Sequence, residues 1–275
     1  MIIKALTLKM NNTLVRSLLF WILLIVMLFI SGNLSNMIAF EMPKLIYGIL
    51  GAASACLLIG IFLRAENKSF ASVGLVWQKN TLPKFFLGIL IGSVIMVLLI
   101  LALTFFTGVR LNRTANEIQP LTWLLYLLVI IPLAWMEELG FRSYVFLKLN
   151  TAYGLWWAQL ISAVAFAFYH IAYGWSWQAA FLGTFVWAFV FGLAAIISGG
   201  IAVPTGIHAA LNFLQPLCGL KADKLSIWEF SLDHSNDAQS RLDRVGILLQ
   251  IFIFITALLC THLFLRRKHR TTRNS

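Results

Sequence analysis

The sequence predicts an all-α, polytopic integral membrane protein with about eight transmembrane helices and a buried polar site. Hydrophobic residues make up 60% of the 275 residues and charged residues only 11%, whereas a soluble domain carries about 25% charged residues. The mean hydropathy is +0.87. Apolar stretches recur with roughly the 20-residue length that a helix needs to cross a bilayer. These three observations exclude an ordinary soluble domain.

Eight apolar segments follow one another along the chain. We expect them to be helices, because only helices and closed barrels satisfy their backbone in lipid, and the period-two alternation of a barrel is absent. Pro204 and Gly206 predict an interrupted or kinked helix near the start of the seventh segment. The segments cover residues 18–35, 45–63, 85–107, 121–139, 155–173, 178–198, 200–219 and 245–265.

We divide the chain into three parts. Residues 1–119 hold the first three transmembrane helices with their loops, residues 120–219 hold the polar core in helices four to seven, and residues 220–275 hold an external loop, the last transmembrane helix and a basic tail. The external loop includes a short amphipathic piece around 225–232. The glycine pair at 199–200 predicts a tight turn.

The net charge of +11 does not indicate nucleic-acid binding, because its densest run, Arg266 to Arg270, directly follows the last apolar segment. Basic residues that flank apolar segments anchor them on the cytoplasmic side. With the N-terminus inside, fourteen of the 21 Lys and Arg residues fall on the inner side and seven on the outer side. This excess predicts that both termini are cytoplasmic. The three cysteines lack CxxC spacing and are expected to be core residues.

Few ionisable residues fall inside the apolar segments. Only Glu137 and Glu138 of the ten acidic residues do so, together with His170 and His208. Each such residue costs on the order of 2.5–3.5 kcal/mol at a helix centre on the insertion scale. One of them alone would be read as a structural polar group, but four from three segments indicate a functional site.

The spacing of the glutamates suggests two separate roles. Glu138 and Arg142 are four residues apart, so they share a helix face and can pair. Glu137 is rotated by about 100° from Glu138. It can therefore face a cavity while Glu138 is held by the arginine.

The histidines also have neighbours on their own faces. Phe166 lies one turn before His170 and can pack against its ring, and His208 shares a face with Asn212. A carboxylate and an imidazole can take a proton from water. A second imidazole and a carboxamide can stabilise the oxyanion of a tetrahedral intermediate. The set therefore suits a peptide or amide hydrolase without a serine or cysteine nucleophile.

Three ordered motifs carry a family resemblance. They are Glu-Glu-x-x-x-Arg at 137–142, Phe-x-x-x-His at 166–170 and His-x-x-x-Asn at 208–212. The set, within about residues 120–215, resembles the CPBP family of intramembrane proteases, named for CAAX prenyl proteases and bacteriocin-processing enzymes and also called Abi.

The resemblance implies a role for each position. Glu137 resembles the catalytic glutamate and His170 its partner in activating water, while His208 and Asn212 resemble the oxyanion-stabilising pair. The supporting residues are Glu138, Arg142 and Phe166.

The resemblance implies a glutamate mechanism without a cofactor. Zinc is the alternative, since one carboxylate and two histidines are also a plausible zinc set. The expected substrate is a peptide or a membrane protein, and the expected location is a bacterial cell membrane. Two other functions stay open: a non-enzymatic bacteriocin immunity or scaffold protein of the same family, and a proton-coupled transporter.

The tryptophans around the fifth segment have two interpretations. Trp156, Trp157, Trp175 and Trp177 bracket this segment. An interfacial aromatic belt is the favoured interpretation. A lid over a substrate entry is the alternative.

Overall fold

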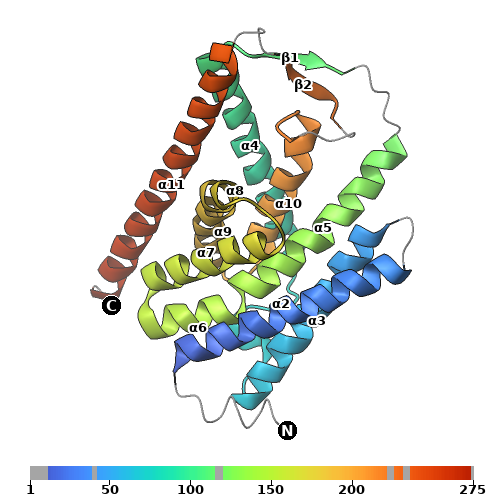
Figure 1. Ribbon diagram of the computed structural model, residues 1–275. Helices are drawn as coiled ribbons and strands as arrows, with labels where there is room; N and C mark the ends of the chain where they lie inside the picture. Colours follow the sequence, from blue (N-terminus) through green and yellow to red (C-terminus); the bar gives the residue numbers. More distant parts are fainter. Residues whose placement is uncertain (1–11, 39–41, 115–119, 222–225, 232–235, 274–275) are drawn as a thin grey trace.

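The computed structural model describes residues 12–38, 42–114, 120–221, 226–231 and 236–273. The predicted helical membrane fold is confirmed, and each of the eight apolar segments forms a helix or, at 178–198, a continuous run of three helical pieces (Figure 1). The helices are α2 (Thr13–Ile38), α3 (Pro43–Ala65), α4 (Thr81–Thr107), α5 (Pro120–Arg142), α6 (Tyr144–Tyr153), α7 (Leu155–Ala172), α8 (Trp177–Ala179), α9 (Phe185–Ser198), α10 (Ala202–Leu217) and α11 (Asn236–Arg273).

Seven stretches of the described chain are long and apolar enough to cross a membrane. The protein is therefore an integral, multi-pass membrane protein. The one predicted segment that is not among these seven is the seventh, 200–219, which forms α10; this helix has 16 residues and is the most enclosed of the apolar helices. Helix α6 follows α5 after a break at Ser143 and was not expected as a separate element.

Short irregular elements connect the long helices. A 3₁₀ turn, η1 (Phe70–Val73), lies between α3 and α4. A π-helical turn, η2 (Ala180–Thr184), joins α8 to α9. Gly199, with φ of 71°, makes the expected tight turn before α10. The interruption therefore precedes Pro204, which lies in the first turn of α10 and does not break that helix.

The external segment differs from the prediction. Strand β1 (Arg110–Arg113) pairs with β2 (Trp228–Ser231) in an antiparallel two-stranded sheet. The expected amphipathic piece around 225–232 is a strand in its described part, and its two ends lie outside the described residues. Helix α11 then begins at Asn236 and continues through the basic tail to Arg273, so both the loop and the non-helical tail are shorter than expected.

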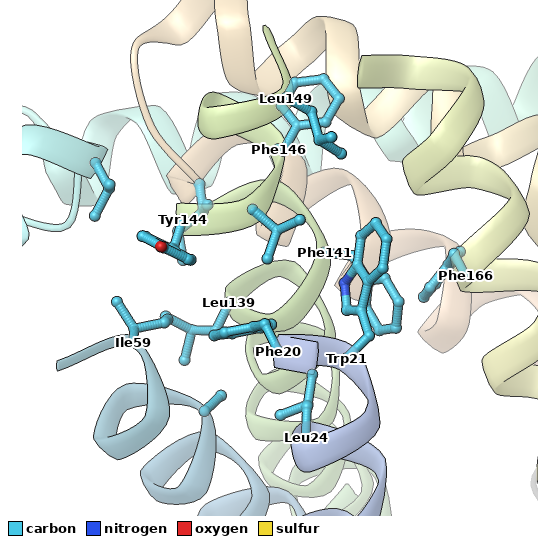
Figure 2. Packing of buried hydrophobic residues seen from close by; sticks show 14 of the residues in the cluster. Phe20, Trp21, Leu24, Ile59, Leu139, Phe141, Tyr144, Phe146, Leu149 and Phe166 are labelled. Carbon is cyan, nitrogen blue, oxygen red and sulfur yellow. The ribbon is translucent and has the colours of Figure 1, made fainter. Parts of the chain in front are cut away.

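One hydrophobic core surrounds the carboxyl end of α5. Figure 2 shows side chains from α2, α3, α5, α6 and α7 filling this space. Trp21 stacks on Phe141 and donates a 3.2 Å hydrogen bond to the carbonyl of Gly140. A Cβ at Gly140 would meet Leu24 at 2.6 Å, so α2 lies directly against α5. This packing fixes the helical turns that carry the two glutamates.

Helices α4 and α10 cross at very short range through glycines. A Cβ at Gly88 would collide with the carbonyl oxygen of Val203, and one at Gly206 with that of Phe85. At Gly92 it would lie 2.7 Å from the carbonyl oxygen of Ile207. Small residues four apart permit this kind of backbone approach in membranes. The contact positions α10, and with it His208.

The cysteine prediction is only partly correct. Cys56 and Cys218 are half-buried and Cys260 is exposed, and all three are free thiols. Cys260 lies on α11, a helix of which little is buried and which runs along one edge of the molecule (Figure 1). Its side chain is therefore not a core residue.

Candidate active site

The innermost part of the site is an ion pair between neighbouring turns of α5. The side chain of Glu138 is fully buried, and its Oε2 lies 3.6 Å from Nε of Arg142. The guanidinium carbon of Arg142 lies 4.1 Å from the centre of the Phe166 ring and 5.2 Å from that of Phe191. The expected contact between Glu138 and Arg142 is therefore present, and two aromatic rings enclose the arginine.

His208 connects this ion pair to Glu137. Its Nδ1–H donates a 2.8 Å hydrogen bond to Oε1 of Glu138, and its Nε2 lies 3.5 Å from Oε2 of Glu137. Its ring stacks on Phe191 with 4.7 Å between ring centres and 14° between planes. One hydrogen bond and one stacking contact thus fix the orientation of the imidazole.

His170 reaches the same carboxylate from α7. A carbonyl oxygen can only accept, so Nδ1 of His170 carries the proton in its 2.9 Å hydrogen bond to the carbonyl of Phe166. The other nitrogen, Nε2, then lies 4.0 Å from Oε2 of Glu137 with its lone pair available. The Phe166 ring packs edge-on against the imidazole at 4.6 Å, as expected.

Glu137 is the point on which both imidazoles converge. Its side chain is 15% exposed, against 0% for Glu138. Its Oε2 is buried and forms no hydrogen bond with any described residue. A polar separation of 4.0 Å, as between this oxygen and His170, is long for a direct hydrogen bond and suits a bridging water.

Asn212 lies one turn after His208 on α10 and is half-buried. The hydroxyl of Tyr126 donates a 3.5 Å hydrogen bond to its backbone carbonyl. Within the described residues no hydrogen bond joins the Asn212 amide to Glu137 or to either histidine. The structure therefore places Asn212 near the cluster and leaves its role as a prediction.

Several residues that sequence reasoning missed complete the site. Phe191 packs on both His208 and Arg142, but nothing distinguishes it from the other phenylalanines of an apolar helix. Trp175 packs edge-on against His170 at 4.9 Å, and its backbone N–H donates to the carbonyl of that histidine. Trp175 therefore contacts a residue of the cluster, and the choice between an aromatic belt and a lid stays a prediction.

The described residues contain no group of three or more His, Cys, Asp or Glu side chains arranged to hold a metal ion. The Nδ1 atoms of His170 and His208 are hydrogen-bonded to Phe166 and Glu138, and these bonds orient the two Nε2 atoms toward Glu137. Such orientation serves either a bound water or a metal. The donor types thus leave the zinc alternative to experiment.

The fold and the cluster define a polytopic membrane protein with a buried glutamate–histidine site. Residues 118–214 match the family model described as type II CAAX prenyl endopeptidase Rce1-like, which is the CPBP/Abi family. The match spans about a third of the chain and contains all three motifs, so the resemblance inferred from them is confirmed over that region. No curated protein matches the chain. The family consists of intramembrane proteases, which supports a protease function at the family level.

Proposed function

We propose that the protein is an intramembrane endopeptidase of the glutamate type, which hydrolyses a peptide bond at or in the membrane. The observation that carries the proposal is the convergence of two imidazole Nε2 atoms, from His170 and His208, on Oε2 of Glu137. The match to a family of intramembrane proteases supports the same reaction class. The substrate would be a peptide or a membrane protein.

Glu137 and His170 would activate the attacking water. Both side chains direct a hydrogen-bond acceptor, Oε2 of Glu137 and Nε2 of His170, toward each other. Nε2 is an acceptor because Nδ1 of the same ring carries the proton that is donated to the carbonyl of Phe166. A water between them could donate one O–H to each, which orients its oxygen lone pair away from both bases. Removal of one proton then generates the nucleophile by general-base catalysis.

His208 and Asn212 would stabilise the oxyanion that forms when water attacks the carbonyl. Donation from Nε2 of His208 requires the imidazolium, since Nδ1–H is already directed to Glu138. In that form its charge, with that of Arg142, would balance the two glutamates. Donors held in place before the reaction cost no reorganisation in the transition state.

The surroundings favour Glu137 over Glu138 as the base. Glu138 is fully buried and its two oxygens face Arg142 and His208. Glu137 retains some exposure, and the described groups nearest its Oε2 are the two histidines and no arginine. A water molecule can therefore approach Glu137, whereas Glu138 acts by positioning His208.

We also propose that both termini are cytoplasmic. Arg16 near the start of α2 and Lys148 on α6 both form ion pairs with Glu66, which directly follows α3. These basic residues therefore gather at one end of the helices, as cytoplasmic anchoring predicts. Labelling of single cysteines at positions 16 and 112 in intact cells with an impermeant reagent would test this orientation.

The function is tested with purified, detergent-solubilised protein and a quenched peptide library. We expect cleavage by the wild type and by Glu229→Gln, a control on β2, and a greatly reduced cleavage rate for Glu137→Gln. Cleavage should be indifferent to a chelator. Loss of activity with the chelator, together with stoichiometric zinc in the protein, would instead make Glu137, His170 and His208 metal ligands. A cellular phenotype that persists in folded Glu137→Gln would select the non-enzymatic role.

A further inference from the structure

A cavity of about 440 Å³ lies between α3, η1, the first turns of α4, the middle of α5 and the start of α10. Its wall is mainly apolar and includes Cys56, Leu75, Phe85, Ile131, Leu139 and Ala202. Glu137, His170, His208 and Asn212 are absent from its lining. The cavity is therefore separate from the proposed catalytic cluster, and its volume lies in the range of about 300–1,000 Å³ that is common for small-molecule sites.

The cavity opens toward the lipid-facing side of the helices. Its lining includes the large apolar residues Phe70, Trp77, Leu82 and Trp135, which are 40–74% exposed. Leu82 and Trp135 lie on the spanning helices α4 and α5, which carry further large apolar side chains that are exposed, among them Leu90 and Leu128. Trp77, in the loop before α4, is the type of residue that gathers at the membrane interface. A molecule dissolved in the bilayer can thus enter from the side.

The chain segment that forms one side of the cavity is basic. The chain from 64 to 84 carries Arg64, Lys68, Lys79 and Lys84, and its single acidic residue, Glu66, is already paired with Lys148. Lys84 lines the cavity itself, where its ammonium donates a 2.7 Å hydrogen bond to the carbonyl of Ser198. An ammonium has three N–H donors. Two of them therefore remain for an anionic group at the cavity.

We propose that the cavity binds an acyl chain of an anionic phospholipid from the bilayer, with the phosphate of the headgroup at Lys84. The apolar wall fits a hydrocarbon chain, the lateral opening connects it with a lipid reservoir, and the basic segment complements the headgroup. Basic residues near the cytoplasmic leaflet attract anionic lipids in this way. This inference does not depend on the proposed function.

The bound chain would also support the catalytic helices. Leu139, in the cavity wall, directly follows Glu138, and Thr205, also in the wall, precedes His208 by one turn. The acyl chain would therefore pack against the turns of α5 and α10 that hold the hydrogen bond between Glu138 and His208. Lipid at this position would fix the distance between those two helices.

Cys56 provides a direct test, because it lines the cavity. A variant with Cys218→Ser and Cys260→Ala leaves Cys56 as the single thiol. We would measure its labelling by a membrane-permeant maleimide in nanodiscs of phosphatidylcholine, with and without phosphatidylglycerol. Occupancy should slow labelling roughly tenfold when the anionic lipid is at about ten times its dissociation constant. Equal rates in the two lipid compositions would overturn the proposal, and protection by an apolar substrate peptide alone would assign the cavity to the substrate.

Lipid that remains bound through purification gives a second test by native mass spectrometry of the full chain. Ala202→Phe, at the start of α10, fills the cavity and should lose the bound phosphatidylglycerol, whereas Ala102→Phe, on α4 and outside the cavity lining, should retain it. Lys84→Gln should also lose it, and Lys44→Gln, at the start of α3, should not. Retention by both Ala202→Phe and Lys84→Gln would contradict the proposal. If Ala202→Phe does not fold, the Cys56 measurement still decides the question.

Discussion

Glu138 accepts a 2.8 Å hydrogen bond from Nδ1 of His208, which joins a fully buried carboxylate on α5 to an imidazole on α10. The same carboxylate faces Arg142, whose terminal guanidinium nitrogens form no hydrogen bonds with other described residues. Glu138 is therefore the main electrostatic partner of a buried cation and the orienting group for a proposed catalytic histidine. The two adjacent glutamates should respond differently to substitution.

Glu138→Ala should destabilise the protein by about 3–5 kcal/mol, because removal of one partner leaves a buried charge without compensation. It should also abolish cleavage, since His208 loses its orientation. Thermal unfolding of the detergent-solubilised protein measures the first effect. Glu137→Ala is the matched control, and its loss of stability should be much smaller. Similar losses for both variants would argue against separate roles.

Gly206→Ala should displace α10 from α4, because the new Cβ would collide with the carbonyl oxygen of Phe85. Overpacking of this kind costs about 1–3 kcal/mol. The cleavage rate should fall by more than the loss of folded protein alone would cause, since the displaced helix carries His208. Gly246→Ala on α11 is the control, because its Cβ would meet no atom within 4 Å. Wild-type cleavage by Gly206→Ala would show that the close crossing does not position the histidine.

Asn212→Ala should lower the cleavage rate at saturating substrate by about 10²–10³, the usual effect of losing one oxyanion donor. KM should change little, because the interaction forms in the transition state. Asn212→Ala leaves the described hydrogen bond from Tyr126 in place, since that bond uses the backbone carbonyl. Steady-state kinetics on the identified substrate separate the two parameters. A change in KM alone would assign Asn212 to substrate binding.

Stability should fall at acidic pH through Glu66, which lies outside the membrane spans. Burial raises the pKa of this carboxyl, but hydrogen bonds from Lys148 and Tyr144 outweigh that effect and hold the pKa below its usual value. A lowered folded-state pKa stabilises the protein fully above the unfolded pKa of about 4.3. This contribution disappears as the pH drops through the folded-state pKa.

Unfolding of the wild type and Glu66→Gln at a series of pH values measures this contribution. The stability difference between them should shrink as the pH falls below about 4.3, where the unfolded carboxyl begins to take up protons. Glu229→Gln on β2 controls for a change of charge at the surface. A stability difference between the wild type and Glu66→Gln that stays constant down to the lowest accessible pH would contradict the lowered pKa of Glu66.

The sequence predicted the helical membrane fold because span-length apolar segments leave the backbone few alternatives in lipid. It also indicated which polar residues meet, since Glu137, Glu138, His170 and His208 are conspicuous in an apolar chain. Their distances could not be predicted, because they depend on how α5, α7 and α10 pack. The resulting separations of 2.8 to 4.0 Å arise from tertiary contacts.

Other features gave weaker signals. The glycines Gly88 and Gly92 carry the four-residue spacing of a close helix contact, which could have indicated the α4–α10 crossing. The β1–β2 pair joins segments more than 100 residues apart, and strands of four residues leave too short a pattern to recognise. The bracing by Phe191 and Trp175 depends on tertiary contacts with His208 and His170 that local spacing does not specify.

The central claim is that the carboxylate of Glu137 activates the attacking water, and the cleavage rate of Glu137→Gln tests it most directly. The amide keeps the shape of the side chain but is not a base. Loss of general-base catalysis predicts a rate lower by about 10²–10⁴, in a protein whose thermal unfolding matches that of the wild type. A folded Glu137→Gln protein that cleaves the same substrate at the wild-type rate would contradict the mechanism.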